Sequence, residues 1–475
     1  MQTNLFEQQI QQQKYASALV NIKGLGVKTF SYLIPDDMKD KIKIGQAILV
    51  PFGRQGLINA FCVGFSDYLS GDFKVKKISK ILDETPLFSI DYLKLLEWVA
   101  NYYCCDLVTV LNAAIPMKLI EKASKTETLI EFIKYDGATK RQIEILKLLE
   151  KSDKMPLILF EKYARTTRAT IKKLEALGCV KLYQEELYRN PLDILRITER
   201  EALFELSGDQ KKVYEGIKEK IFPTSTPHLG IVGEGRVRGE VNTHPEILLH
   251  GVTASGKTEV YFKLIDDTIK SGKNVLFLAP EIALASQLTK RLAKKFGTKD
   301  VAIWHSSISD GERYDVWQKL YKNEIKILAG ARSAVFAPLK NIGLIIIDEE
   351  HESAYKQTTP APRYDARVVA KKLSEFHNCP LLLGSATPDI STYYRAVNSG
   401  NLFELKKRFN DAKVPPVLVI NMQEYGRAAY RSIISKPMQV EIKDTLDNGK
   451  QVILLINRRG FSTYTQCQAC GHVIE

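Results

Sequence analysis

The sequence predicts a multidomain α/β protein that starts with a β-rich region and continues into a parallel, doubly wound lobe. Its 475 residues are too many for one hydrophobic core and predict about three or four domains. From residue 198 onward, short apolar runs alternate with helical stretches, which is typical of a parallel sheet covered by helices. Before residue 117, alternating apolar runs lie between Gly, Pro and Asp turns, which is typical of antiparallel strands.

Composition and charge indicate a globular protein with an excess of basic residues. A content of 45% hydrophobic and 26% charged residues is that of an ordinary globular protein. No apolar run reaches the roughly 18 to 20 residues that span a bilayer, and the N-terminus lacks the apolar core of a signal peptide. We therefore expect a cytoplasmic protein that contacts no membrane. A net charge of +13 favours a polyanionic partner, although a basic surface that binds nothing gives the same number.

The seven cysteines are an odd count for a secreted disulfide framework. Five of them lie in apolar surroundings and are expected to be reduced thiols of the core: Cys62, Cys104, Cys105, Cys179 and Cys379. The other two, Cys467 and Cys470, have the spacing of a zinc knuckle. They supply half of a site, because a structural zinc needs four ligands and only His472 lies nearby. Two unpaired thiols are the alternative.

Residues 1–117 are expected to form a small β-barrel or sandwich. The runs ALVNI, TFSYLIP, QAILVPFG and INAFCVGF supply its strands. A single helix from Asp91 to Pro116 follows, with apolar residues at helical spacing and with Trp98, Tyr102 and Tyr103 available for packing. This helix is expected to close the barrel.

Residues 118–197 have the pattern of three helices followed by a short hairpin, as in a winged helix. The third helix is expected to begin at a cap of Thr166 or Thr167 and to end at Gly178. Its apolar residues are expected to face inward: Ile171, Leu174 and Leu177. In a DNA-binding version its basic residues would face the phosphates or a groove: Arg165, Arg168, Lys172 and Lys173. A helical spacer whose charges are merely solvated explains the pattern equally well.

A phosphate-binding motif lies within residues 198–407. The run EILLH leads into GVTASGKT, in which Gly251 and Gly256 let backbone N–H groups close around phosphates. Lys257 would reach the terminal phosphates, and Thr258 would hold Mg²⁺ at the start of a helix. The alternative is a glycine-rich loop of an unrelated α/β domain.

A second motif, DEEH, ends the apolar run LIIID. Asp348 lies at the carboxyl end of this predicted strand, where it can hold the metal ion, and Glu349 can orient and deprotonate water. The other predicted strands, NVLFLAP, VAIWHS, IKILAGARS and LLLGSATP, also end in polar or small residues. Because open α/β sheets bind ligands at the carboxyl ends of their strands, the chemistry is expected along one edge.

Two further stretches depart from this pattern. Residues 224–246 are rich in Gly, Val and charge without a period, and we expect a disordered insertion there. Residues 408–475 start a second unit, with a helix near Lys436 to Asn448 and the strand QVILLINRR.

Together these motifs resemble the bacterial replication restart helicases, the primosomal protein N′ family of superfamily 2 (DEAH/DEXH type). The resemblance covers nearly the whole chain and rests on LSGDQ, GVTASGKTEVY, LAPEIALASQ, GARSAVFAPL, DEEHESAYKQ, PRYDARVVA and LLLGSATP, in the family's order. It implies a module for the 3′ end of a DNA strand, a winged helix, a RecA-like P-loop lobe, and the start of a second RecA-like lobe. A cysteine-rich insertion that binds two zinc ions would begin at Cys467.

The resemblance also implies the residues of an ATP site. Gln210 would read adenine, and the phosphate loop would comprise Gly251, Val252, Thr253, Ala254, Ser255, Gly256, Lys257 and Thr258. Ala254 replaces a more usual glycine, and binding is expected to survive the extra methyl group. Ser385, Ala386 and Thr387 would couple the nucleotide state to lobe movement, unless they are only a strand-to-helix cap. His351 is expected to hydrogen-bond to them rather than to ligate a metal.

DNA contacts are implied in the same way. Arg332 and Ser333 would contact the DNA backbone. An aromatic-rich loop would sense DNA through Tyr355, Lys356, Arg363, Tyr364 and Arg367, because aromatic and cationic side chains together suit stacked bases and phosphates. The alternative is that the tyrosines pack under the loop.

The implied function is a monomeric 3′-to-5′ DNA helicase, driven by MgATP, that acts on forked and single-stranded DNA and starts primosome assembly. Its implied partners are other primosome proteins, the single-stranded DNA-binding protein and the machinery that loads the replicative helicase. The family's arginine finger and later motifs are not in the sequence, so this chain is expected to bind ATP and DNA but to hydrolyse ATP weakly. A DNA-binding platform switched by ATP, and a translocase that separates no strands, are the alternatives.

Overall fold

The computed structural model describes residues 14–22, 24–26, 28–68, 75–83, 85–115, 126–150, 154–164, 166–186, 192, 201–223, 245–280, 282–306, 308–409, 416–421, 434–455, 465–466 and 473–474. The chain forms two compact units, Met1–Asp411 and Ala412–Glu475, which are described separately. The expected insertion at 224–246 lies almost wholly outside the described residues, as do Arg165, Cys467, Cys470 and His472. None of the described helices is long and apolar enough to cross a membrane.

The N-terminal sheet is antiparallel, with five strands in the order β2-β1-β4-β3-β5. Its strands are β1 (Tyr15–Val20), β2 (Phe30–Leu33), β3 (Ala47–Pro51), β4 (Leu57–Ser66) and β5 (Lys80–Ile81), with a short 3-10 helix, η2 (Asp36–Met38). Backbone hydrogen bonds join Leu33, at the end of β2, to Lys76 and Ile78 just before β5, so both edges of the sheet are linked. The prediction of a β-rich region is confirmed.

Two helices follow this sheet where the sequence predicted one. They are α2 (Ile90–Tyr102) and α3 (Leu107–Ala114). The expectation of a single helix is wrong because Cys104 adopts a left-handed φ of 49°, which interrupts the helical hydrogen bonds. Asp106 then accepts hydrogen bonds from the backbone N–H groups of Gly24 and Gly26. Both helices belong to the same hydrophobic core as the parallel sheet that follows.

The next region contains three helices and a small antiparallel sheet of the order β7-β6-β8. Its elements are β6 (Thr126–Phe132), α5 (Lys140–Glu150), β7 (Lys154–Pro156), α6 (Leu157–Tyr163), α7 (Arg168–Ala176) and β8 (Val180–Glu186). The expected cap is confirmed at Thr167, whose side chain accepts from the backbone N–H of Thr170. Leu177, expected to face inward, is exposed. The strand after α7 pairs with β6, which precedes the helices, rather than with a following strand, so the winged helix stays a prediction.

The main sheet of the first unit has seven parallel strands in the order β11-β12-β10-β13-β14-β9-β15. They are β9 (Glu246–Gly251), β10 (Asn274–Leu278), β11 (Val301–Trp304), β12 (Ile327–Gly330), β13 (Ile342–Asp348), β14 (Leu381–Ser385) and β15 (Leu402–Leu405). The predicted parallel sheet is confirmed, and β15 is an additional edge strand that the sequence did not predict.

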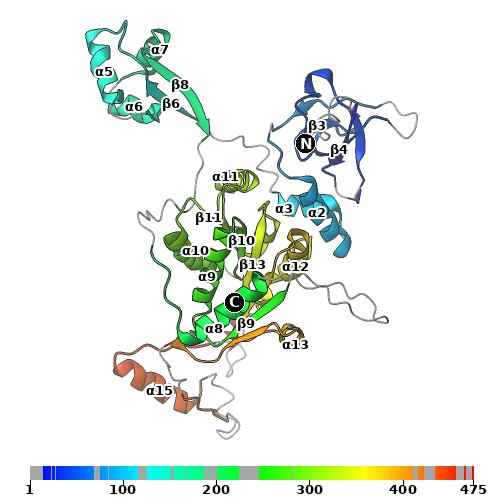
Figure 1. Ribbon diagram of the computed structural model, residues 1–475, viewed down its shortest axis with the longest axis vertical. Coiled ribbons are helices and arrows are strands. Elements are labelled where there is room, and N and C mark those ends of the chain that lie inside the picture. The colour runs from blue at the N-terminus through cyan, green and yellow to red at the C-terminus, as the bar shows by residue number, and fades with distance from the viewer. Residues whose placement is uncertain are drawn as a thin grey trace. The chain divides into compact units, whose positions relative to one another are not determined.

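Helices cover both faces of this sheet, with α9 and α10 on one side of the strands and α12 on the other (Figure 1). The helices are α8 (Gly208–Ile221), α9 (Lys257–Lys270), α10 (Ile282–Phe296), α11 (Asp310–Tyr321), α12 (Ala366–His377) and α13 (Ile390–Asn398), with 3-10 helices η4 (Arg332–Phe336) and η5 (Ser353–Tyr355). The central strands are buried because both faces are covered, which explains their continuous apolar runs.

The second unit contains α15 (Lys436–Asp447), capped by Ser435, and a two-stranded pair, β16 (Thr465–Gln466) and β17 (Val473–Ile474). The predicted helix is confirmed. The predicted strand QVILLINRR is not confirmed for its described part: residues 451–455 have no regular structure, Ile453 and Leu455 are exposed, and residues 456–459 lie outside the described residues. A strand needs a neighbour to pair with, and no described segment pairs with these residues. The predicted domain boundaries stay predictions.

Candidate active site

Three parallel strands bring the two predicted motifs to one edge of the sheet. The strand that carries the phosphate loop, β9, and the strand that ends in Asp348, β13, lie on either side of β14. Asp348 pairs in register with Gly384, and Ser385 pairs with His250. The motifs are thus about 10 Å apart across two strand spacings. Lys257 spans this gap, with its Nζ 3.8 Å from Oε1 of Glu349.

The phosphate loop, residues 251–258, turns tightly between β9 and α9. Gly256 has a left-handed φ of 84°, and a Cβ there would lie 2.1 Å from Nε2 of Gln210. Ala254 also has a left-handed φ, 64°, which an L-residue adopts only at a cost. Lys257 is almost fully buried and donates a hydrogen bond to the carbonyl of Gly251, 2.8 Å away. The loop therefore holds its lysine inward at the edge of the sheet.

Gln210 lies beside the loop, at the start of α8. Its Nε2 donates to the carbonyl of Ser255 at 2.9 Å, and its Oε1 accepts from the backbone N–H of Ser207 at 2.9 Å. Both ends of the amide are thus engaged with the protein. Gln210 thus lies next to the phosphate loop, and its reading of adenine stays a prediction.

A cavity of about 520 Å³ opens over this edge, within the usual range for small-molecule sites. Its lining contains most of the predicted ATP residues together with five that the sequence did not single out: Phe204, Glu205, Glu259, Arg291 and Phe409. Phe204 is exposed, with the ammonium of Lys295 4.2 Å from its ring centre. The backbone N–H of Phe409 donates to the carbonyl of Ala254. Both aromatic residues come from segments without a strand or helix period, so no pattern identified them.

Asp348 lines the cavity and has a raised pKa. Burial, and after it the neighbouring charge of Glu349, raise the pKa of the Asp348 carboxyl to about 6, whereas Lys257 and the hydroxyl of Tyr261 oppose the rise. Glu349 has a left-handed φ of 47°, a sparsely populated conformation typical of functional sites. The strand end thus combines a destabilised carboxylate with a strained acidic neighbour.

The oxygen atoms at this edge suit Mg²⁺ and a phosphate chain. The hydroxyl of Thr258 and the carboxylate of Asp348 both line the cavity, and hard cations prefer such oxygen ligands. The Oγ atom of Ser255 is buried and has no hydrogen-bond partner, so the loop has unused polar capacity. Within the described ranges there is no cluster of three or more His, Cys, Asp or Glu residues that would hold a metal by protein ligands alone. Mg²⁺ needs no such cluster when substrate phosphates complete its shell.

His351 joins the acidic motif to the end of β14. Its Nδ1 lies 2.7 Å from Oγ of Ser385, and its Nε2 lies 3.4 Å from Oγ1 of Thr387. Ser385 is fully buried, and its Oγ also accepts from the backbone N–H of Thr387. The predicted hydrogen bond between His351 and the segment Ser385–Thr387, which includes Ala386, is confirmed. Its coupling role stays a prediction.

Glu350 is an anchoring residue that the sequence analysis missed. Its buried carboxylate accepts from the backbone N–H of Asp389 at 2.7 Å and from the hydroxyl of Thr392 at 3.3 Å. Arg367 donates to its carbonyl at 2.8 Å. Glu350 therefore ties the acidic motif to the first turn of α13, where a carboxylate is favoured by free N–H groups. Its place in DEEH gave no sign of this burial.

The aromatic-rich loop differs from the prediction. Tyr355 and Tyr364 are buried, so the stacking on bases expected of them is wrong, and the alternative of packing under the loop holds. The hydroxyl of Tyr355 donates to the carbonyl of Asp348 at 2.6 Å. The rings turn inward because their apolar area is worth more in the core than in water.

The cations of this loop fall into two groups. Arg367 forms a bidentate ion pair with Asp365. Arg332 donates to the carbonyls of Ala354 and Lys356, so both arginines support the fold. Lys356 and Arg363 are exposed, and Ser333 is partly exposed. Lys356 and Arg363 are therefore the side chains here with free access to a polyanion.

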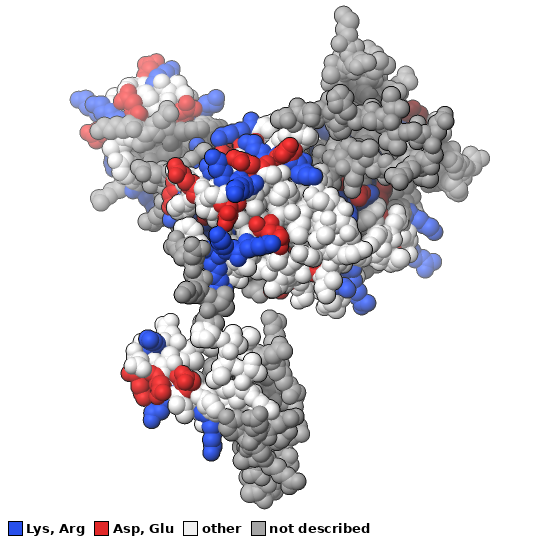
Figure 2. Space-filling view, turned by 60° about the horizontal axis from the view of Figure 1, so that its bottom comes forward, with Lys and Arg blue, Asp and Glu red and all other residues white. Residues whose placement is uncertain are grey.

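Basic residues elsewhere do not gather into one patch on the face in view. Figure 2 shows Lys and Arg interspersed there with Asp and Glu. On α7, Arg168 and Lys172 are exposed, and Nε of Arg168 lies 3.8 Å from Glu161. The net charge of +13 is thus spread over several parts of the chain.

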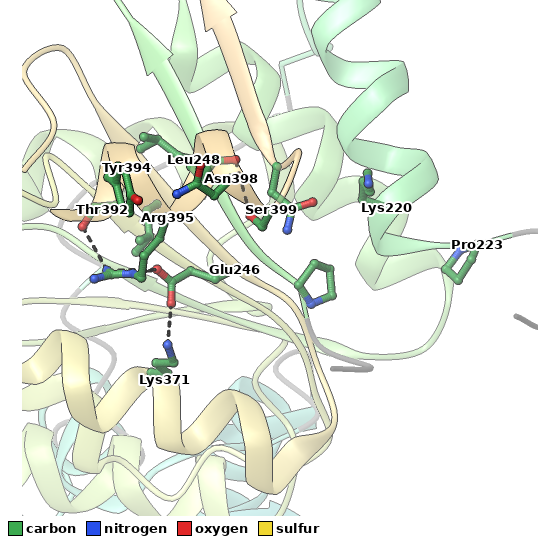
Figure 3. A pocket seen from close by; sticks show the side chains of 14 residues that line it. Lys220, Pro223, Glu246, Leu248, Lys371, Thr392, Tyr394, Arg395, Asn398 and Ser399 are labelled. Carbon is green, nitrogen blue, oxygen red and sulfur yellow. Dashed lines mark hydrogen bonds and ion pairs between the residues drawn. The ribbon is translucent and has the colours of Figure 1, made fainter. Parts of the chain in front are cut away.

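A larger cavity, of about 860 Å³, lies at the other end of β9 (Figure 3). At its centre Glu246, the first residue of β9, is held between Lys371 at 2.9 Å and Arg395 at 3.1 Å. Glu246 and Gly251 are the first and last of the six residues of β9, so five residue steps, about 17 Å, separate them. This cavity is therefore distinct from the site at the carboxyl edge and contains none of the predicted ATP residues.

Comparison with known proteins agrees with this geometry. Residues 18–116 match a family model for the PriA 3′ DNA-binding domain, and residues 238–396 match one described as DEAD/DEAH box helicase. Replication restart protein PriA of Bacillus subtilis (strain 168) is 32% identical over 97% of this chain and 64% of its own length. Its counterparts in Synechocystis and Haemophilus influenzae are also 32% identical, over 63% and 59% of their own lengths. This chain thus spans about three fifths of these relatives.

Proposed function

The chain belongs to the family of PriA-type replication restart proteins, and from this premise we propose that it is the ATP-binding and DNA-binding part of a DNA helicase. One observation carries the proposal: Lys257 and Glu349 approach to 3.8 Å across a cavity whose floor includes Asp348. A cation, a metal-holding carboxylate and a second carboxylate at the carboxyl edge of a parallel sheet are what phosphoryl transfer to water requires.

Each residue has a role in binding and hydrolysing ATP. Lys257 exchanges its bond to the Gly251 carbonyl for charge-assisted bonds to the terminal phosphates, which are stronger. Glu349 orients the attacking water and accepts its proton. Thr258 and Asp348 are the residues that would hold Mg²⁺, which, when bound, neutralises charge on the phosphate oxygens. Gln210 reads the adenine edge from the loop's flank.

The link from ATP to DNA runs through β14. His351 follows the base Glu349 by two residues and hydrogen-bonds to Ser385 and Thr387. A change at the phosphates alters this hydrogen-bond network, and Ser385–Thr387 transmits it to the second lobe, which begins in residues 408–475. The exposed Lys356 and Arg363 contact the DNA backbone beside the same strand end.

DNA recognition is assigned to the N-terminal half. Residues 1–117 bind the 3′ end of a DNA strand. Residues 118–197 form a winged helix that contacts duplex DNA through Arg168 and Lys172. The motor moves 3′ to 5′ along the strand. Forked and single-stranded DNA in the cytoplasm are the substrates. The complete protein acts as a monomer, recognises abandoned replication forks and recruits primosome proteins, the single-stranded DNA-binding protein and the helicase-loading machinery. Cys467 and Cys470, which lie outside the described residues, would supply two of the four ligands of a structural zinc site.

Nucleotide binding tests the proposal directly. The chain should bind mant-ADP, a fluorescent nucleotide, in the presence of Mg²⁺, and Lys257→Ala should weaken binding at least tenfold. Lys270→Ala, at the other end of α9 and paired on the surface with Asp266, is the matched control and should bind as the parent does. If Lys257→Ala and Lys270→Ala bind equally well, the ATP site is not here. ATP turnover of the protein with and without forked DNA then tests the link to DNA.

A further inference from the structure

Tyr261 is a fully buried residue that lies directly under the candidate active site. It is on α9, one helical turn after Lys257, and its hydroxyl donates a hydrogen bond to Oδ1 of Asp348 at 3.1 Å. Its ring packs edge-to-face against Phe277 of β10, with centroids 5.7 Å apart. Burial and this contact leave the hydroxyl little freedom, because buried aromatic rings in close-packed cores have few rotamers.

The neighbouring strand leaves room for this hydroxyl. Gly384 on β14 is the register partner of Asp348, and a Cβ at Gly384 would lie 1.6 Å from the Tyr261 hydroxyl oxygen. The same Cβ would lie 3.4 Å from Oδ1 of Asp348. The φ of Gly384 is not left-handed, so conformation does not require glycine here. Glycine is required because the hydroxyl of Tyr261 occupies the space that a Cβ would fill.

The hydrogen bond from Tyr261 stabilises the ionised form of the Asp348 carboxyl. A buried carboxylate is destabilised by loss of water, and a donor to one of its oxygens offsets part of that cost. Because Tyr261 engages Oδ1, rotation of the carboxylate about its last bond is restricted. Donors that orient a metal-holding side chain commonly contribute 10- to 100-fold to metal affinity.

We propose that Tyr261 is a positioning residue that holds the Asp348 carboxylate ready for the Mg²⁺ that accompanies the nucleotide. Phe277 and Gly384 form the slot that keeps it in place. The inference rests on the proposed function, because it assigns a helper to the same site. It adds a three-part unit, Tyr261–Asp348–Gly384, drawn from α9, β13 and β14.

Tyr261→Phe tests the proposal because it keeps the ring and removes only the hydroxyl. Tyr214→Phe is the matched control: the Tyr214 hydroxyl donates to Asp267 at 2.5 Å, away from the cavity. The measurement is binding of mant-ADP by fluorescence, first in EDTA and then during titration with MgCl₂. Mn²⁺ bound to the protein–nucleotide complex, counted by electron paramagnetic resonance, provides a second readout.

Tyr261→Phe should raise about tenfold the Mg²⁺ concentration that gives half of the Mg²⁺-dependent increase in mant-ADP binding. The affinity for mant-ADP in EDTA should stay within twofold of the parent's. Tyr214→Phe should shift neither. Equal Mg²⁺ dependence of Tyr261→Phe and the parent would overturn the proposal, as would an equal shift in Tyr214→Phe, which would indicate a general loss of packing. If Tyr261→Phe does not fold, Gly384→Ala, which displaces the hydroxyl, must give the same shift. If the parent binds no nucleotide at all, the proposed function fails first.

Discussion

Nδ1 of His351 lies 2.7 Å from the hydroxyl oxygen of Ser385, so the acidic motif at the end of β13 is hydrogen-bonded to the end of β14. The two residues are neighbours only because β13 and β14 pair in parallel and end at the same edge. Thr387 approaches the other ring nitrogen of His351. This short network is the structural candidate for passing the state of the nucleotide to the remainder of the protein.

Ser385→Ala should separate nucleotide binding from DNA stimulation. The substitution removes the hydroxyl that contacts both His351 and the Thr387 backbone, and leaves the cavity lining intact. Affinity for mant-ADP should stay within twofold, and stimulation of ATP turnover by single-stranded DNA should fall about tenfold, or ~1.4 kcal/mol. Ser399→Ala, which removes a hydroxyl at the end of α13, should change neither. Full stimulation in Ser385→Ala would contradict the coupling role.

Arg363→Ala should weaken DNA binding, whereas Arg367→Ala should lower stability. Arg363 is exposed, so its loss should weaken binding to single-stranded DNA and lower the slope of log affinity against log salt by about 1, with unchanged stability. Arg367 bonds to Asp365 and to the Glu350 carbonyl, so its loss should lower the free energy of unfolding by about 2 kcal/mol. Fluorescence anisotropy at several salt concentrations and urea unfolding measure the two effects. A lower salt slope without destabilisation in Arg367→Ala would restore it as a DNA contact.

Ala254→Gly should stabilise the parallel lobe by about 0.5–1 kcal/mol. Relief of the left-handed conformation at φ 64° gains about 1–2 kcal/mol, and the freer unfolded chain takes back roughly 0.4–1 kcal/mol. Urea unfolding followed by the fluorescence of the buried Trp304 and Trp317 reports on this lobe. Ala293→Gly, inside α10, is the opposite control and should lose about 1 kcal/mol or more. Destabilisation by Ala254→Gly would mean that the methyl group contributes packing.

Asp348→Asn should stabilise the metal-free protein near neutral pH. The folded pKa of about 6 lies above the unfolded value of 3.8, so the folded state binds more protons between these values. Stability therefore falls as pH rises from about 4 to 6 and stays low above it. About two pKa units correspond to a gain of ~3 kcal/mol, and the amide oxygen of an asparagine can still accept the hydrogen bond from Tyr261.

The measurement is urea unfolding in EDTA at pH 4 and pH 7.5. The gain from Asp348→Asn should appear at pH 7.5 and nearly vanish at pH 4, while Mg²⁺-dependent nucleotide binding is lost at both. Asp91→Asn, on the surface of α2, is the control and should show less than about 0.5 kcal/mol at either pH. A pH-independent effect would show that Asp348 carries no buried charge.

The residue pattern along the chain was enough to predict the buried strands and the phosphate loop, because these depend on neighbouring residues. The apolar runs of β10, β13 and β14 are continuous because both faces of the sheet are covered, and Gly256 is needed for a left-handed turn. Because parallel strands align their carboxyl ends, the motifs at Lys257 and Asp348 could also be expected to meet. The break at Cys104 and the edge strand β15 were beyond such reasoning, since neither follows from periodicity.

The sequence by itself thus determined the phosphate loop, the acidic strand end and their common edge, because these depend on residue type, spacing and the parallel rule. Tertiary structure alone decided which side chains are buried. Tyr355 and Tyr364 turned inward, Glu350 accepts from the backbone N–H of Asp389 at the start of α13, and Tyr261 reaches Asp348 across 87 residues of sequence into the space beside Gly384. Burial depends on what packs against a residue from distant parts of the chain, and no local spacing contains that information.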